Sequence, residues 1–104
     1  EDVSKYFDCD YDVPYMNMSV QVKDTRLTSI THIDNTCRIQ TVDGDGHFAR
    51  LLRKYKEMTG ESVILNTSLN IGGSPIASRI WEAKELFSKK GIQDMAIGNN
   101  FYDK

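Results

Sequence analysis

The stretch that decides the fold is residues 61–75, which read ESVILNTSLNIGGSP. Its first part, Glu61 to Asn66, is a short apolar run bounded by Gly60 and by polar residues, a pattern typical of a strand buried on both faces. The remainder is a loop rich in hydroxyls, amides and glycine. The stretch therefore predicts a central strand that ends in a polar loop, at the edge of the sheet where open α/β folds bind ligands.

Further strands are expected on the amino-terminal side of this strand. Apolar and polar residues alternate over 15–23, which predicts a half-buried strand. Residues 30–42 are rich in β-branched side chains and predict a hairpin. A three-residue loop aligns Ile33 with Ile39 on one face and leaves the polar side chains on the other, with Asn35 as the left-handed residue that such a loop needs.

Two helices and a last strand complete the predicted fold. Apolar residues from Phe48 to Met58 follow helical spacing, so we expect a helix that is capped by Asp45, buries this stripe and stops at Gly60. Its basic residues, Arg50, Arg53, Lys54 and Lys56, are interpreted as a solvated face. A second helix over 78–90, with Ile80, Ala83 and Phe87 facing inward, and a strand over 94–98 follow. The order predicts an α/β fold with helices packed on a mixed β-sheet.

Length and composition set the broad class of protein. The chain has 104 residues and a formal net charge of −2, so we expect a single domain over 1–104. The acidic residues 1–14 are interpreted as an exposed lead-in segment. The absence of a basic footprint argues against DNA binding, and no apolar run or leader pattern supports membrane insertion or secretion, so a cytoplasmic location is expected. Cys9 and Cys37 are read as free thiols.

The loop after the predicted central strand is the first candidate site. The side chains of Asn66, Thr67, Ser68 and Asn70 offer amides and hydroxyls. The glycines at 72–73 leave backbone N–H groups accessible as further donors. Such donors can hold phosphate or carbonyl oxygens without a charged side chain. The alternative is that these side chains only satisfy the backbone of their own loop.

The polar face of the predicted hairpin is the second candidate site. It carries His32, Asp34, Arg38 and Gln40. The Arg38 guanidinium needs an anion, which is either the structural carboxylate of Asp34 or a ligand phosphate. His32 is more simply a hydrogen-bonded histidine than a catalytic one. No metal-ligand spacing, Ser-His-Asp arrangement or paired carboxylate is specified, so no catalytic residue is assigned.

Two segments resemble a known family. Residues 31–42 read THIDNTCRIQTV, and residues 65–70 read LNTSLN before GSPI at 73–76. They resemble the C-terminal domain of the NodU/CmcH-type O-carbamoyltransferases, which typically show THVDGTARVQTV, LNTSFN and GEPIV. The resemblance extends to three shorter segments, YFD at 6–8, PYM at 14–16 and GIQDMAIG at 91–98.

The resemblance implies a function. Members of this family transfer a carbamoyl group from carbamoyl phosphate to a hydroxyl of a small molecule, with ATP as co-substrate. Their C-terminal domain resembles the YrdC/Sua5 fold and forms carbamoyl-adenylate, and an N-terminal Kae1-like domain with a metal ion performs the transfer. Ser68 and Asn70 fit the SxN motif of YrdC-like proteins, and Arg38 matches an arginine that we expect on phosphate or carbamoyl oxygens.

The resemblance thus implies nucleotide and carbamoyl-phosphate binding by Arg38, Asn66, Thr67, Ser68 and Asn70. Secondary candidates are His32, Asp34, Gln40, Gly72 and Gly73.

Departures from the family pattern keep an alternative open. Gly72 and Ser74 stand where many members have Arg and Glu. We expect the 104 residues to be the closing portion of a larger enzyme, inactive alone and completed by a Kae1-like domain in cis or in trans. The alternative is a YrdC-like module, without catalysis, that binds a nucleotide or a partner. A YrdC/Sua5 protein that modifies tRNA is disfavoured by the missing KxR motif. A homodimer is left open.

Overall fold

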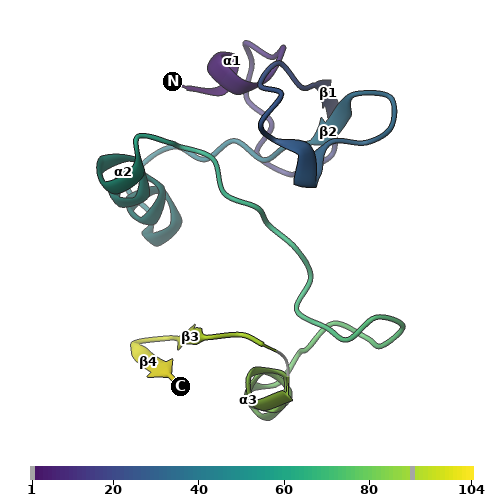
Figure 1. Ribbon diagram of the computed structural model, residues 1–104. Coiled ribbons are helices and arrows are strands. Elements are labelled where there is room, and N and C mark those ends of the chain that lie inside the picture. Colours follow the sequence, from purple (N-terminus) through teal and green to yellow (C-terminus); the bar gives the residue numbers. More distant parts are fainter. Residues whose placement is uncertain (1, 90) are drawn as a thin grey trace. The chain divides into compact units, whose positions relative to one another are not determined.

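The computed structural model describes residues 2–89 and 91–104, which divide into two compact units, Glu1–Leu65 and Asn66–Lys104 (Figure 1). We call these the first unit and the second unit and describe each by itself, so the expectation of a single domain stays a prediction. Helices and strands occur in both, and the predicted α/β class is confirmed. The strands of the described residues form two antiparallel pairs, however, where a single mixed sheet was expected.

The start of the chain builds the core of the first unit. The prediction that residues 1–14 form an exposed lead-in is wrong for the described part, because helix α1 (Val3–Tyr6) and the residues after it are packed inward. Asp8, Asp10 and Asp12 are exposed, whereas Phe7, Cys9 and Val13 beside them are buried. Eight buried side chains form this core: Tyr6, Phe7, Cys9, Val13, Val20, Val22, Cys37 and Ile39.

A short antiparallel pair supports this core. Strand β1 (Ser19–Gln21) pairs with β2 (Thr36–Arg38), and Val20 lies opposite Cys37. The predicted strand over 15–23 is therefore present only in its middle. Phe7 adds an antiparallel bridge to Val22, so the chain start lies alongside β1.

The predicted hairpin over 30–42 is wrong. Its first arm begins with a 3-10 turn, η1 (Thr28–Ile30), and β2 takes β1 as its partner. A tight turn over 32–36 precedes β2, in which Asn35 has a left-handed φ of 62°. That conformation confirms the role expected of Asn35. Its side-chain amide donates to the Val22 carbonyl at 3.1 Å, which ties the turn to the end of β1.

The helix expected before Gly60 is confirmed as α2 (His47–Thr59), and Gly60 ends it with a left-handed φ of 80°. The predicted cap is wrong: Gly46 occupies the cap position, and the Asp45 carboxylate instead accepts a hydrogen bond from Arg53 at 3.0 Å. The prediction that the apolar stripe is buried is also wrong for this unit, because Phe48, Leu51, Tyr55 and Met58 are all exposed. The buried residue of α2 is Ala49.

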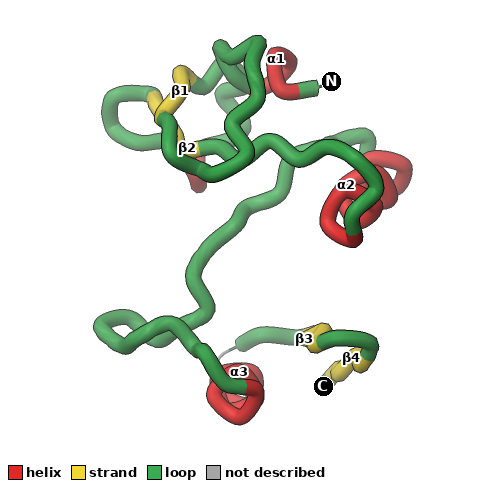
Figure 2. Tube along the Cα trace, turned by 180° about the vertical axis from the view of Figure 1, so that it is seen from behind, coloured by secondary structure: helices red, strands yellow, loops and turns green. Residues whose placement is uncertain are grey.

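The predicted central strand over 61–66 is wrong as well. Residues 61–79 form no strand (Figure 2), and Ile64 and Leu65 are exposed. Side-chain hydrogen bonds hold the beginning of this segment in place of a strand ladder. The buried Tyr6 hydroxyl donates to Glu61 Oε2 at 2.7 Å and accepts from the Ser62 backbone N–H at 3.0 Å.

An ion-pair network extends this junction. The Arg26 guanidinium donates to Glu61 Oε1 at 2.8 Å and to Asp24 Oδ2 at 2.6 Å. The hydrogen bond from Arg26 lowers the pKa of Asp24 from its ordinary 3.8 to about 2. The hydrogen bond from Tyr6, followed by that from Arg26, lowers the pKa of Glu61. Residue 61 therefore connects α1, the segment after β1 and the segment after α2.

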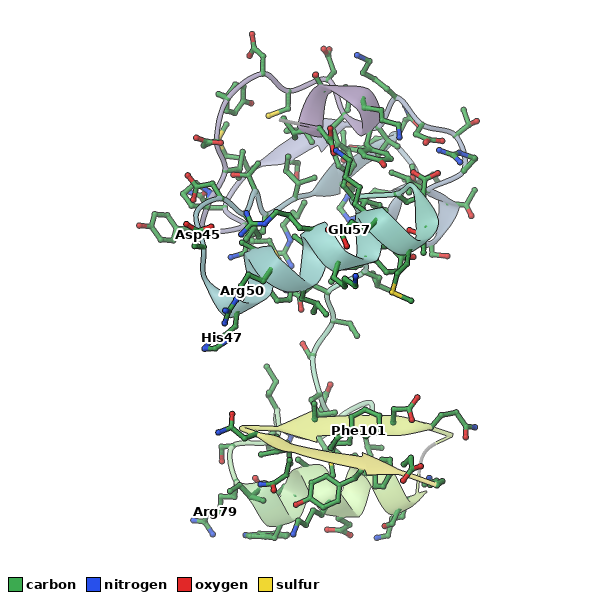
Figure 3. The ribbon with its side chains drawn as sticks, turned by 90° about the vertical axis from the view of Figure 1, so that its left-hand side faces the viewer. Asp45, His47, Arg50, Glu57, Arg79 and Phe101 are labelled. Atoms are coloured by element: carbon green, nitrogen blue, oxygen red, sulfur yellow. The ribbon has the colours of Figure 1, made fainter. Side chains whose placement is uncertain are left out.

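The second unit consists of α3 (Ile80–Lys89), β3 (Asp94–Ile97) and β4 (Asn100–Asp103), with the β3–β4 hairpin beside α3 (Figure 3). The helix and the strand predicted over 78–90 and 94–98 are confirmed within about two residues, except that Lys90 lies outside the described residues. The Glu82 carboxylate accepts from the backbone N–H groups of Ser78 and Arg79 at 2.8 and 2.9 Å, which satisfies free donors at the helix start. Strand β4 was not predicted.

Side chains of α3 differ from the prediction in their burial. Leu86 is the buried residue of the helix, and Ala83 and Phe87 are half-buried. Ile80, expected to face inward, is 60% exposed. Across residues 2–89 and 91–104, the helices are too short or too polar to cross a membrane.

Candidate functional site

Arg38 ends β2 with its side chain outside the core. Its neighbours Cys37 and Ile39 are buried, and the alternation of a strand turns Arg38 to the opposite, exposed face. Ser19 lies opposite it on β1. No ion pair or hydrogen bond of its guanidinium is found within residues 2–89 and 91–104. The guanidinium is therefore placed where an anion can reach it from solvent.

Of the two anions considered for Arg38, the carboxylate of Asp34 is occupied by another residue. Asp34 Oδ1 accepts from the Thr36 hydroxyl at 2.7 Å and from the Thr36 backbone N–H at 3.1 Å. These hydrogen bonds, the one from the hydroxyl first, lower the pKa of Asp34. His32 Nδ1 lies 3.2 Å from the same hydroxyl oxygen. His32 and Asp34 thus shape the turn before β2, and the carboxylate is already satisfied there.

Gln40 also has an internal partner. Its side-chain amide donates to the Pro14 carbonyl at 2.9 Å. The next residue supports the same contact, because the Thr41 hydroxyl accepts from the Val13 backbone N–H at 2.8 Å. Gln40 therefore joins the segment after β2 to the segment before β1.

In the second unit, the loop after residue 65 presents its polar side chains to solvent. Asn66, Thr67 and Ser68 are exposed. Asn70 is half-buried, and its amide donates to the Ser74 carbonyl at 2.8 Å and to the Ile71 carbonyl at 3.2 Å. Asn70 thus acts on its own loop, whereas the side chains of Asn66, Thr67 and Ser68 remain open to a ligand.

The glycines of this loop form a tight turn. The Ser74 N–H donates to the Ile71 carbonyl at 2.9 Å, with Gly72 and Gly73 between them. Gly73 has a φ of 81°, which is the conformation a type II turn requires at its third position. The predicted site residues thus fall into two sets: Arg38, His32, Asp34 and Gln40 in the first unit, and residues 66–73 in the second.

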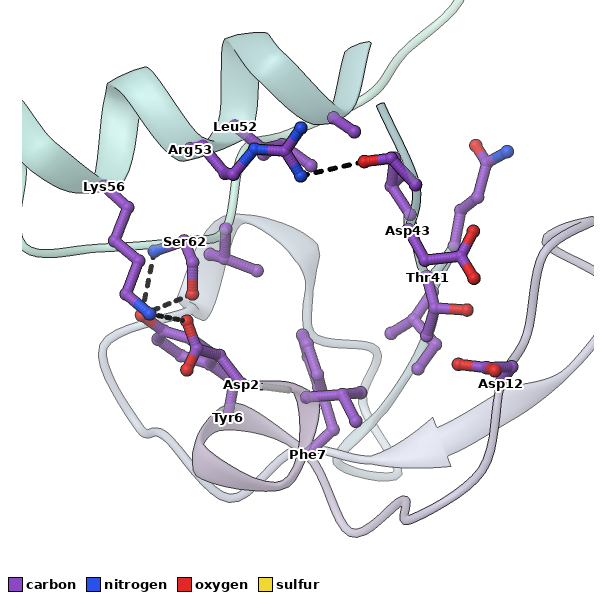
Figure 4. A pocket seen from close by; sticks show the side chains of 17 residues that line it. Asp2, Tyr6, Phe7, Asp12, Thr41, Asp43, Leu52, Arg53, Lys56 and Ser62 are labelled. Carbon is purple, nitrogen blue, oxygen red and sulfur yellow. Dashed lines mark hydrogen bonds and ion pairs between the residues drawn. The ribbon is translucent and has the colours of Figure 1, made fainter. Parts of the chain in front are cut away.

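A pocket that the sequence did not indicate lies within the first unit (Figure 4). It has a volume of about 390 Å³ and lies between α1, the segment 39–44 and α2. Its polar lining consists of Asp2, Asp12, Gln40, Thr41, Asp43, Arg53, Lys56 and Ser62. The helical basic residues Arg53 and Lys56, interpreted above as part of a solvated face, therefore line a cavity.

Both cations of the pocket have internal partners. Lys56 Nζ lies 2.5 Å from Asp2 Oδ2, and this hydrogen bond is the main reason why the pKa of Asp2 is lowered. Arg53 donates to the Gly44 carbonyl at 2.8 Å and to Asp45. An anionic ligand would have to displace these partners, so the pocket is not a ready anion site. In the part of the chain that is described, no three His, Cys, Asp or Glu side chains gather as metal ligands.

Comparison with known proteins identifies the family. A family model described as "Carbamoyltransferase C-terminus" matches residues 1–104. The chain is 34% identical to a 3'-hydroxymethylcephem-O-carbamoyltransferase of Amycolatopsis lactamdurans over 107 residues, which cover 100% of this chain and 21% of the relative. It is 32% identical to the enzyme of the same name from Streptomyces clavuligerus, and the match covers 98% of this chain and 20% of the relative. The chain therefore belongs to the family of carbamoyltransferase C-terminal regions.

Nodulation protein NolNO of Sinorhizobium fredii is 29% identical over 112 residues, which cover 100% of this chain and 16% of that protein. The chain thus spans about a fifth of the length of the curated relatives it matches.

Proposed function

We propose that this chain is the part of an O-carbamoyltransferase that binds ATP and carbamoyl phosphate. The family match over residues 1–104 and the names of two relatives support a carbamoyl donor. In the proposed reaction, water cleaves carbamoyl phosphate to carbamate and phosphate. A carbamate oxygen then attacks the α-phosphorus of ATP, and pyrophosphate leaves, which yields carbamoyl-adenylate.

The second half of the reaction transfers the carbamoyl group. An acceptor hydroxyl oxygen attacks the carbamoyl carbon and loses its proton, and AMP departs with the electrons of the broken bond. We assign this step to a Kae1-like domain that precedes this region, in cis or in trans, together with any metal ion that the reaction uses. The acceptor is a small molecule with a hydroxyl group, and we expect the whole enzyme in the cytoplasm.

The observation that carries the proposal for this chain is that the Arg38 side chain is exposed and has no partner among the described residues. Its guanidinium is exposed and has no partner within residues 2–89 and 91–104, while the carboxylate of Asp34 is occupied by Thr36. Negative charge grows on the phosphate oxygens as the adenylate forms, and a positioned guanidinium stabilises it with paired N–H donors. We therefore assign Arg38 to phosphate or carbamoyl oxygens.

The loop residues Asn66, Thr67 and Ser68 are proposed as neutral donors to phosphate or carbonyl oxygens. Their exposure leaves the amide and hydroxyl groups accessible. Asn70, through its hydrogen bonds to Ile71 and Ser74, is proposed to hold the loop in the shape that presents them. His32, Asp34, Gln40, Gly72 and Gly73 are assigned to the support of these segments.

An NMR titration with ATP tests the proposal. We expect weak, saturable shifts at Arg38 and at residues 66–70, and no pyrophosphate exchange by this chain alone. The variant Arg38→Ala should weaken ATP binding about tenfold or more, because a hydrogen bond to a charged group contributes about 1.5–3 kcal/mol. The matched control is Arg79→Ala, since Arg79 is exposed beside α3 and has no proposed role (Figure 3). Equal effects of the two variants would contradict the proposal.

The alternative function is a module that binds a nucleotide or a partner without catalysis. Gly72 and Ser74, which lack the side chains expected at those positions, favour it. Carbamoyl transfer by the gene's full product excludes this alternative, whereas ATP binding with no transfer supports it.

A further inference from the structure

Helix α2 carries an apolar surface that its own unit does not cover. Phe48, Leu51, Tyr55 and Met58 are 46%, 55%, 39% and 76% exposed. They recur at the spacing of one helix face, so they form a continuous stripe rather than scattered surface residues. We call these four residues the α2 stripe. Single exposed apolar side chains are ordinary on a protein surface, but a continuous stripe of large ones marks a contact surface.

The first unit holds α2 by a different face. Ala49, Leu52, Arg53 and Lys56 line the pocket beside the core, and Lys56 pairs with Asp2. At 3.6 residues per turn, the centre of this inner face lies roughly 130° around the helix from the centre of the α2 stripe. The helix thus packs on its unit through Ala49, Leu52 and two basic residues, and turns its most apolar face away from the unit.

We propose that the α2 stripe is the docking surface for the carbamoyltransferase polypeptide that precedes this region. This inference rests on the proposed function, because it assumes that the chain works within a longer enzyme. The family matched is that of carbamoyltransferase C-termini, and the relatives are about five times as long as this chain. The preceding four-fifths of such a protein supply the occupant.

The surroundings of the stripe define the chemistry of the matching surface. Ridges of large side chains at helical spacing pack into the grooves of an apolar helix or sheet face. Arg50 lies about 120° around the helix from the centre of the stripe, on the side that carries Glu57. Its guanidinium contacts His47 Nδ1 at 2.8 Å (Figure 3). The partner surface is therefore an apolar helix or sheet face.

Cysteine labelling tests this surface. Leu51→Cys places a thiol on the stripe, and Glu57→Cys places the control thiol on another face of the same helix, where Glu57 pairs with Lys54. The native Cys9 and Cys37 are 5% and 1% exposed, so we expect them to react slowly. Each variant is prepared in the 104-residue chain and in the product of the whole reading frame upstream of Glu1, and the rate of alkylation is measured without nucleotide.

We expect both thiols to react at similar rates in the 104-residue chain. In the long form, the Leu51→Cys thiol should react at least tenfold more slowly, and the Glu57→Cys thiol should be unchanged. Equal rates in the long form, or a reading frame that opens at Glu1, would overturn the proposal. Protection of Leu51→Cys already in the short chain would overturn it too. If that protection depends on protein concentration, the stripe is covered by a second copy of the chain. If it is independent of concentration, the stripe is covered by residues 66–104.

This experiment separates the two proposals. Protection of the stripe in a long form that transfers no carbamoyl group would uphold the docking surface and refute the function. Carbamoyl transfer by a long form in which the Leu51→Cys thiol stays reactive would uphold the function and refute the docking surface.

Discussion

The two units of the chain differ in how much they bury. The first unit gathers eight buried side chains into one cluster, whereas Leu86 is the buried apolar residue found in the described part of the second. Burial of apolar surface supplies most of the stability of a fold, so the two units should respond very differently to substitution. The family segment at 65–70 lies mainly in the less buried unit, whereas the family segment at 31–42 contributes Cys37 and Ile39 to the core of the first unit.

The largest expected effect comes from the core of the first unit. Tyr6→Ala should lower the free energy of unfolding of this unit by about 3–5 kcal/mol, because it removes a buried ring and leaves Glu61 and Ser62 without the hydroxyl. Tyr15→Ala, at a tyrosine that is 82% exposed, should change it by less than about 0.5 kcal/mol. Hydrogen exchange of the amides at 6–39 measures the stability of both variants. Similar losses of stability in Tyr6→Ala and Tyr15→Ala would contradict this prediction.

A smaller effect is expected in the second unit. Leu86→Ala should destabilise residues 66–104 by about 2 kcal/mol, at the low end for buried leucines, because a sparsely packed unit can close around the gap. Ile80→Ala on the same helix is the control, since Ile80 is 60% exposed. Exchange of the amides in α3 and β3 should accelerate for Leu86→Ala alone. A matching loss of protection in the first unit would show that the two units do not unfold separately.

The smallest effect concerns pH. Because the pKa values of Asp24 and Glu61 are lowered in the folded state, their contribution is complete above their ordinary values of 3.8 and 4.5. It is lost as pH falls toward the folded value of Asp24, about 2. Arg26→Gln should therefore be slightly less stable than the parent at pH 7, and the two should converge near pH 2. The unfolding temperatures of the parent and of Arg26→Gln, measured from pH 2 to pH 7, test this. A difference between them that stays constant with pH would show that the ion pairs of Arg26 do not cause the pH dependence of stability.

Local signals in the sequence predicted local structure well. The spacing from Phe48 to Met58 and the glycine after it predicted α2 and its end, and Asn35 was correctly expected to be left-handed. These features depend on residues within one or two turns of each other. The burial of the α2 stripe was predicted wrongly because amphipathic spacing shows that a face needs a partner but not where the partner is.

Non-local pairing was the main source of error. The apolar run at 61–66 fits a buried strand, but a strand needs a neighbour, and side chains of Tyr6 and Arg26 hold its beginning instead. β2 has β1 as its partner rather than the segment just before it, because Asp34 bonds to Thr36 and closes a turn there. The pocket combines Asp2 with α2, and no spacing in the sequence relates positions so far apart.

The hydroxyl of Tyr6 also constrains when the first unit can fold during synthesis. Its bond to the Ser62 N–H closes a loop over a separation of 56 residues, which includes every strand and helix of the unit after α1. The entropic cost of such a closure grows only slowly with length, but the closure cannot occur before its far end exists. Helix α2 can form as it leaves the ribosome, whereas Tyr6 must wait for Glu61 and Ser62. Until then the hydroxyl of Tyr6 lacks both partners, so this closure is a late step in the folding of the first unit during synthesis.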